Sequence, residues 1–348
     1  MKLTFRWFGK DDPATLQNIR QIPTMSGIVS AVYSVPAGEV WPEEEITAIQ
    51  REAAASGLAF EVVESVPVHE DIKLGKPTRE RLIENYRENI LRLGRVGVKV
   101  VCYNFMPVFD WLRSELYKEL QDGSTTLAFD NETLLSLDPA KGDLSLPGWD
   151  ESYTAEELRA LLDAYKGMDK EALWENFAYF IRNVIPTCEE AGIVLAIHPD
   201  DPPWDIFGLP RIITGAQSYA RMREISPSPA NGIALCLGSL GVDPANNIPA
   251  IVKKYGPRIH FVHARNVTWV GERSFEEAPH PSACGSLDMY RIFKALHEAG
   301  FDGYIRPDHG RMIWGETGRP GYGLYDRALG ATYIAGLWEA IEKQSREG

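Results

Sequence analysis

Eight short apolar segments rich in β-branched residues recur along the 348-residue chain, and amphipathic stretches of helical length separate them. Several segments are apolar on both faces, which is typical of strands in a parallel sheet that is covered on each side. Strict alternation of strand and helix predicts an α/β fold, the closed (β/α)8 TIM barrel, whose chemistry lies at the C-terminal ends of the strands. The predicted strands are residues 3–8, 27–33, 59–65, 98–105, 193–199, 232–238, 259–266 and 303–309.

The predicted helices follow the strands in turn. The helix at 43–56 has a proline and acidic residues at its start and a glycine after its end, the usual signals of a helix N-terminus and C-terminus. The full set of predicted helices is 13–20, 43–56, 78–95, 170–190, 216–225, 244–254, 286–299 and 326–342.

One long interruption, about residues 106–169, separates the fourth strand from its helix. A structureless loop of that length is unusual in a folded domain. The sequence FDWLRSELYKEL at 109–120 indicates a charged amphipathic helix, and TAEELRALLDAYKG at 154–167 indicates another. We therefore expect a single domain over 1–348 with an extra helical excursion above the barrel mouth, which acts as a lid or as a contact in a homodimer or higher homo-oligomer.

The net charge of -13 excludes the usual partners of basic proteins. Nucleic acids and anionic membranes are bound through basic patches, so we expect neither as a partner. No apolar stretch approaches the roughly 20 residues that span a bilayer. A small anionic substrate stays compatible with this charge, because one local group of arginines can hold a carboxylate.

The four cysteines, at positions 102, 188, 236 and 284, are too few and too scattered for a disulfide framework in a chain of this length. The N-terminus MKLTFRWFGKDD becomes charged too early for a signal peptide. Both observations predict a cytoplasmic protein. In that compartment, a thiol at a strand end is free to bind a metal.

Four metal-ligand residue types end four consecutive predicted strands: His198, Cys236, His263 and Asp308. Neighbouring strands lie about 4.8 Å apart, so inward side chains at one level can converge on a single ion. Taken alone, Cys236 fits a core position better than a ligand role, and His263 fits both equally. Taken together, the residues predict a mixed N, S and O site that favours Fe²⁺, Zn²⁺, Co²⁺ or Mn²⁺ over Mg²⁺ and Ca²⁺.

His309 and Tyr322 are the candidate catalytic groups. An imidazole works as base or acid near neutrality, and His309 directly follows Asp308. Adjacent strand residues point to opposite faces, so both reach one site only where the strand turns, which Gly310 permits. Tyr322 stands between two glycines and could donate a proton. The alternatives are an orienting histidine and a loop aromatic, and the sequence does not decide which residue is acid and which is base.

Further polar side chains near predicted strand ends are candidates for binding substrate hydroxyls or a carboxylate, arginine in bidentate fashion. Dinucleotide-binding, Walker and G-x-S-x-G motifs are missing from the sequence. The candidate substrate-binding residues are Tyr103, Asn104, Arg265, Asn266, Arg306 and Arg311.

Several long motifs resemble the mannonate dehydratase family, with the xylose isomerase-like barrel as the wider relative. The resemblance covers nearly the whole chain and includes FRWFG at 5–9, VCYNFMPVFDW at 101–111, FVHARNV at 261–267 and RPDHGRMIWGETGRPGYGLYDRALGATY at 306–333. It implies dehydration of D-mannonate to 2-dehydro-3-deoxy-D-gluconate in hexuronate (glucuronate) catabolism, with Fe²⁺ or Mn²⁺. It also implies that the ligands are His198, Cys236, His263 and Asp308, and that His309 and Tyr322 are catalytic.

Two other functions fit the residues alone. A metal-dependent sugar isomerase or epimerase on the same barrel would move a proton without losing water. A non-catalytic barrel would bind a sugar acid without turnover. Formation of a 2-keto-3-deoxy acid from mannonate separates the dehydratase from both.

Overall fold

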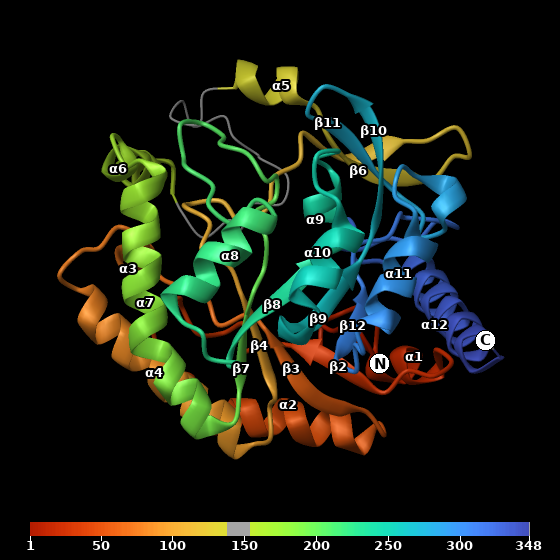
Figure 1. Ribbon diagram of the computed structural model, residues 1–348, viewed down its shortest axis with the longest axis horizontal. Coiled ribbons are helices and arrows are strands. Elements are labelled where there is room, and N and C mark those ends of the chain that lie inside the picture. Colours follow the sequence, from red (N-terminus) through yellow and green to blue (C-terminus); the bar gives the residue numbers. More distant parts are fainter. Residues whose placement is uncertain (138–153, 348) are drawn as a thin grey trace.

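The computed structural model describes residues 1–137 and 154–347. Eight parallel strands close into a barrel in the order β1-β12-β9-β8-β7-β4-β3-β2, which confirms the predicted fold (Figure 1). Each barrel strand overlaps a predicted one. The barrel strands are β1 Lys2–Arg6, β2 Gly27–Ser30, β3 Ala59–Glu64, β4 Val100–Tyr103, β7 Val194–Ile197, β8 Asn231–Cys236, β9 Ile259–Ala264 and β12 Tyr304–Pro307.

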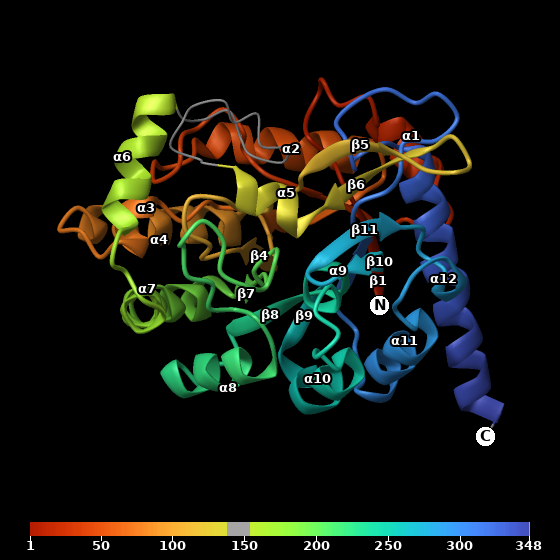
Figure 2. The same cartoon turned by 90° about the horizontal axis from the view of Figure 1, so that it is seen from above.

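Helices surround the barrel as a ring when it is viewed from above (Figure 2). The 22-residue helix α7 (Lys170–Ala191) begins where the Asp169 side chain accepts from the Ala172 N–H and ends at Gly192, whose φ of 66° suits glycine. The ring contains α2 Glu43–Ala55, α4 Arg79–Arg95, α7 Lys170–Ala191, α8 Ala216–Ile225, α10 Ile248–Tyr255, α11 Met289–Glu298 and α12 Tyr325–Glu347; shorter helices are α1 Leu16–Gln21, α3 Glu70–Lys73 and α9 Leu237–Gly241.

The core has two parts because successive strand residues point to opposite faces. On β4, Val100 and Cys102 face the barrel interior, whereas Val101 and Tyr103 pack against the helices. Apolar side chains fill the barrel interior, and together they form a second cluster. Its members are Val29, Val62, Val100, Cys102, Ala196, Ala234, Phe261 and Tyr304.

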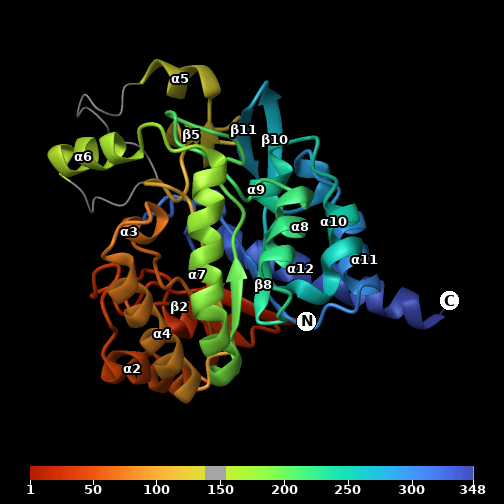
Figure 3. The ribbon, with the colours of Figure 1, turned by 60° about the vertical axis from the view of Figure 1, so that its left-hand side comes forward.

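A second, antiparallel sheet covers one end of the barrel in the order β10-β11-β6-β5 (Figures 1 and 3). Strand β10 begins at Asn266, directly after the C-terminal end of β9, so this sheet lies over the C-terminal ends of the barrel strands. The sequence did not predict it. Its strands are β5 Glu115–Glu119, β6 Thr125–Phe129, β10 Asn266–Gly271 and β11 Ser274–Ala278.

The predicted helix at 109–120 is wrong, because its second half is β5. The turn that follows contains Asp122 and Gly123, the latter with φ of 79°, and returns the chain as β6 in an antiparallel hairpin. Helices are nevertheless present in the interruption: α5 spans Asn131–Ser136 and α6 spans Ala155–Tyr165, the second of which confirms the helix predicted at 154–167. The part of the interruption between 138 and 153 lies outside the described residues. In the part of the chain that the structure describes, no helix combines the length and apolarity needed to span a membrane.

Candidate active site

The four predicted metal ligands meet at the C-terminal ends of their strands. Cys236 is paired with His263 across β8 and β9, and His198 and Asp308 directly follow β7 and β12. Ligand atoms of His198, Cys236 and His263 all lie within 4.8 Å of one another. The Asp308 carboxylate lies 3.5 Å from Cys236 Sγ and 3.8 Å from His263 Nδ1. The structure therefore brings together residues that are far apart in the sequence.

The donor atoms fit a borderline-soft divalent metal ion. His198 Nδ1 lies 2.6 Å from the Pro199 carbonyl, so Nδ1 carries the hydrogen and Nε2 keeps its lone pair for a metal. The Cys236 sulfur accepts from the Ser239 hydroxyl at 3.0 Å and from the Ser239 N–H at 3.4 Å. Cys236, His263 and Asp308 are buried and His198 is half-buried. Nitrogen, sulfur and oxygen donors in one set favour a transition metal over Mg²⁺ or Ca²⁺.

Arginines balance the negative charge beside these ligands. Arg306 Nη1 lies 2.8 Å from Asp308 Oδ1, while Nε and Nη2 donate to the two oxygens of Glu64 at 3.0 and 2.9 Å. Arg6 adds a contact of 3.1 Å to Glu64. Burial alone would raise the pKa of the Glu64 carboxyl, but the positive charges of Arg306 and Arg6 hold it well below its usual range.

Glu64 was not predicted as a site residue, although the sequence contains a signal for it. It is the last residue of β3 and pairs with Cys102 of β4. The rule that identified Asp308, a carboxylate at the C-terminal end of a barrel strand, applies equally to Glu64. Its Oε2 lies 3.3 Å from His263 Nε2, so it borders the ligand set.

His309 and Tyr322 form a hydrogen-bonded pair next to the ligands. Strand β12 ends at Pro307, so Asp308 and His309 lie just beyond the strand. His309 Nε2 lies 3.0 Å from the Tyr322 hydroxyl. Burial raises the pKa of Tyr322 to about 12 despite the nearby positive charges. The ring of Phe8 meets that of Tyr322 edge-on at 4.8 Å, which restricts the tyrosine from the other side.

Arg265 occupies the centre of a buried ionic cluster. It contacts Asp201 at 2.9 Å and Glu277 at 2.5 Å, and its Nε lies 3.3 Å from Asp308. Arg113, from the chain leading into β5, bridges the same two carboxylates at 2.9 and 2.6 Å. This cluster joins the barrel to the second sheet. We did not predict Arg113, Asp201 and Glu277 from the sequence, because no local pattern indicates which distant segments lie together.

Several predicted substrate-binding residues lie elsewhere. The Tyr103 ring is on the outer face of β4 and packs against Phe180 at 5.9 Å. The Asn266 side chain accepts from the Val267 and Leu287 N–H groups and donates to the Pro281 carbonyl.

Arg311 and Asn104 are also held by partners outside the ligand set. Arg311 pairs with Asp326 at 3.0 Å and with Asp122 at 2.8 Å. Asn104 accepts from the Met106 N–H at 3.1 Å. Of the six candidates, the structure places Arg265 and Arg306 against the ligands.

Comparison with known proteins identifies the family. A model of D-mannonate dehydratase matches residues 1–348. The chain belongs to the D-mannonate dehydratase family. The mannonate dehydratase of Streptococcus uberis is 58% identical over 348 residues, covering 99% of this chain and 100% of that protein. The mannonate dehydratase of Thermotoga petrophila is 55% identical over 358 residues, covering 99% of each chain.

Solved structures agree with this membership. The crystal structure of mannonate dehydratase from Streptococcus suis serotype 2 matches with a TM-score of 0.93 and 49% identity, covering 99% of this chain and 96% of that chain. A xylose isomerase domain protein from Planctomyces limnophilus matches with a TM-score of 0.57 and 11% identity, covering 98% of each chain. At that identity the second likeness shows the fold alone, so it does not favour the isomerase alternative over the dehydratase family.

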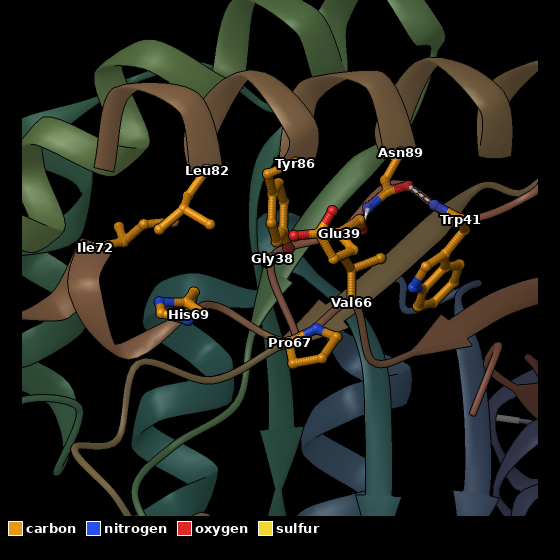
Figure 4. A pocket seen from close by; sticks show the side chains of 10 residues that line it. All are labelled: Gly38, Glu39, Trp41, Val66, Pro67, His69, Ile72, Leu82, Tyr86 and Asn89. Carbon is orange, nitrogen blue, oxygen red and sulfur yellow. Dashed lines mark hydrogen bonds between the residues drawn. The ribbon is translucent and has the colours of Figure 1, made fainter. Parts of the chain in front are cut away.

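Two cavities differ sharply in what they can hold. A cavity of about 280 Å³ opens beside Tyr322 and is lined by Phe8, Asp12, Arg319 and Leu324 among others, which is room for a sugar acid. A second cavity, under α4, offers about 10 Å³, roughly the space of one water molecule (Figure 4). Of these two cavities, the first is lined by Tyr322 and the second by none of the candidate site residues of this mannonate dehydratase family member.

Gly238 is needed because a guanidinium group packs against its backbone. A Cβ at this position would lie 2.0 Å from Arg265 Nε. We expect Gly238→Ala to displace Arg265 and to lower the free energy of unfolding by about 1–3 kcal/mol, measured by denaturant titration. The matched control is Gly336→Ala in α12, where a Cβ meets nothing within 4 Å and the helix gains propensity. Equal stability of Gly238→Ala and the wild type would contradict this close approach.

Proposed function

We propose that this chain dehydrates D-mannonate to 2-dehydro-3-deoxy-D-gluconate and water. One observation carries the proposal: the consecutive residues Asp308 and His309 connect a set of metal-ligand side chains to a hydrogen-bonded proton-transfer pair. Loss of water across C2 and C3 removes a proton from C2 and a hydroxyl from C3. The proton-transfer pair would move these protons, and the metal would stabilise the negative charge that develops on the substrate oxygens. Family membership agrees with this chemistry.

The metal would be Fe²⁺ or Mn²⁺, held by His198, Cys236, His263 and Asp308. When bound, a divalent ion acts as a Lewis acid that lowers the cost of negative charge on the substrate oxygens. His198 is half-buried, so the ligand set is accessible to solvent on the side of this residue. The free thiols of all four cysteines fit a reducing compartment such as the cytoplasm.

Arginines make the site attractive to an anion within an acidic protein. The chain carries a net charge of -13, yet Arg306 and Arg265 are about 1% exposed beside the ligands, and Arg6 is buried nearby. Glu64 and Asp308 offset part of this positive charge and keep the guanidinium groups in place. An arginine can bind a carboxylate through two hydrogen bonds, so this group of arginines is the candidate binding site for the substrate carboxylate.

His309 is the proton acceptor and Tyr322 the proton donor in this proposal. With a pKa raised to about 12, Tyr322 enters the reaction as the neutral phenol and can protonate the C3 hydroxyl as it leaves. His309 takes the C2 proton on Nε2, the nitrogen that faces Tyr322. The resulting enol becomes the 2-keto product by gaining a proton at C3 and losing the proton of its C2 hydroxyl. Protonated His309 returns its proton to the Tyr322 phenolate, so the net change is the loss of one water.

The test is incubation of anaerobically purified protein with D-mannonate, combined with elemental analysis of the same sample. We expect a 2-keto-3-deoxy acid to form in proportion to bound Fe²⁺ or Mn²⁺. An isomerase or epimerase would give an isomeric acid with no loss of water. A non-catalytic barrel would show neither product nor exchange of the C2 hydrogen with deuterium. Either result would refute the dehydratase assignment.

Tyr322→Phe removes the donor while keeping the ring. We expect kcat on D-mannonate to fall by about 10²–10⁴-fold with metal content unchanged, because the leaving hydroxyl loses its acid. Tyr325→Phe is the matched control, since Tyr325 is exposed and its ring packs on Trp314. Steady-state kinetics on both variants measure the effect. Wild-type kcat in Tyr322→Phe would remove Tyr322 from the mechanism.

A further inference from the structure

Glu277 approaches His309 from the second sheet. Both of its carboxylate oxygens contact His309 Nδ1, Oε1 at 2.9 Å and Oε2 at 3.0 Å. The Glu277 side chain is buried and comes from β11, outside the barrel. The roles proposed above for His309 and Tyr322 do not use it.

We propose that Glu277 is a positioning residue that holds His309 in the Nδ1–H tautomer, so that the Nε2 lone pair faces Tyr322 and the substrate. This inference rests on the proposed function and deepens it by naming the group that orients the base. Glu277 touches His309 and acts through it.

The geometry assigns the hydrogen to Nδ1. An ionised carboxylate only accepts hydrogen bonds, so a ring nitrogen about 3 Å from two of its oxygens must be the donor. Nε2 then has no hydrogen and accepts from the Tyr322 hydroxyl at 3.0 Å. The opposite tautomer would place a nitrogen lone pair against two carboxylate oxygens, with no hydrogen between them.

Arg265 does not reverse this assignment. Its Nη1 lies 2.9 Å from His309 Nδ1, but the same nitrogen donates to Glu277 Oε1 at 2.5 Å. Both donors therefore share one carboxylate oxygen. A carboxylate accepts several hydrogen bonds at once, so Glu277 satisfies the guanidinium group and the imidazole together.

Two buried arginines keep Glu277 charged and in place. Arg113 contacts its Oε1 through Nε at 2.9 Å and Nη2 at 2.6 Å, and Arg265 contacts the same oxygen. Burial alone would raise the pKa of Glu277, but the charges of Arg265 and Arg113 and the hydrogen bond from His309 lower it to about 2. Asp201 holds both arginines from the other side. The carboxylate is thereby fixed before substrate arrives.

The test compares Glu277→Gln with Glu276→Gln. Glu276 is the neighbouring residue on β11, pairs with Lys118 and is partly exposed. We expect Glu277→Gln to lower kcat about 10²-fold or more, with KM changed less than about threefold, because an amide also donates and no longer selects one tautomer. Glu276→Gln should keep wild-type kinetics. A kcat in Glu277→Gln within about threefold of wild type would overturn the inference.

A second measurement needs no turnover. The ring nitrogens of histidine are labelled with ¹⁵N in the full wild-type chain loaded with diamagnetic Zn²⁺, and the His309 signals are assigned from their loss in His309→Asn. We expect a protonated Nδ1 and an unprotonated Nε2. A protonated Nε2 with a bare Nδ1 would overturn the inference even if mannonate is turned over. Absence of turnover with the expected tautomer would instead reject the proposed function alone.

Discussion

His309→Asn is expected to lower kcat on D-mannonate by about 10²–10⁴-fold while the protein keeps its metal. Asparagine retains a polar side chain near Glu277 but cannot accept a proton at neutral pH, so the loss should fall on the chemical step. Asp308 stays in place because Arg306 and Arg265 hold its carboxylate from two sides. Steady-state kinetics and metal analysis on the same preparation measure both quantities.

The matched control for that variant is His297→Asn. His297 lies on α11, where its ring packs against Trp338 at 5.4 Å, on the side of the barrel wall away from the ligands. It should retain wild-type kcat. Near-wild-type turnover by His309→Asn with metal bound would show that His309 is not the proton acceptor.

Cys236→Ala is expected to abolish turnover by releasing the metal. The sulfur lies at the centre of the ligand set, 3.5 Å from Asp308, and is fully buried, so water does not readily replace it. Loss of a residue that merely orients a ligand costs about 10–100-fold in metal affinity, and loss of the ligand should cost more. Elemental analysis and the rise in melting temperature on adding Mn²⁺ measure this change.

Cys188→Ala separates metal binding from the loss of a buried thiol. Cys188 is equally buried but lies on α7, outside the barrel, where burial raises the pKa of its thiol to about 12 and keeps it neutral. This variant should bind metal as the wild type does. Full metal content in Cys236→Ala would contradict the assigned ligand set.

The sequence predicted the barrel well because its strands are encoded locally. Each parallel strand is a short apolar run, and the ends of such runs all reach one face of the barrel. That regularity predicted that His198, Cys236, His263 and Asp308 lie together. Applied consistently, the same alternation would have excluded Tyr103, which follows the inward-facing Cys102 and must point outward.

The second sheet could not be predicted from the same signals. The segment at 109–120 has charges at helical spacing, but pairing of β5 with β6 across the Asp122 turn determines its conformation. The pairing of β6 with β11 joins residues about 150 positions apart, as in the hydrogen bond from the Thr126 hydroxyl to the Glu277 carbonyl. Tertiary pairing overrides local propensity in this segment. Without knowledge of that pairing, the contacts of Arg113 and Glu277 could not be predicted.

The ionic cluster around Arg265 has a consequence for engineering. Arg113 lies just before the β5-β6 hairpin, Glu277 lies in the β10-β11 hairpin, and Asp201 lies in the loop after β7. Their side chains nevertheless form one network of buried ion pairs. A graft of the 106–169 segment alone from a relative would separate partners that were matched to each other. Chimeras intended to change substrate range should therefore exchange both hairpins and the β7 loop as one unit.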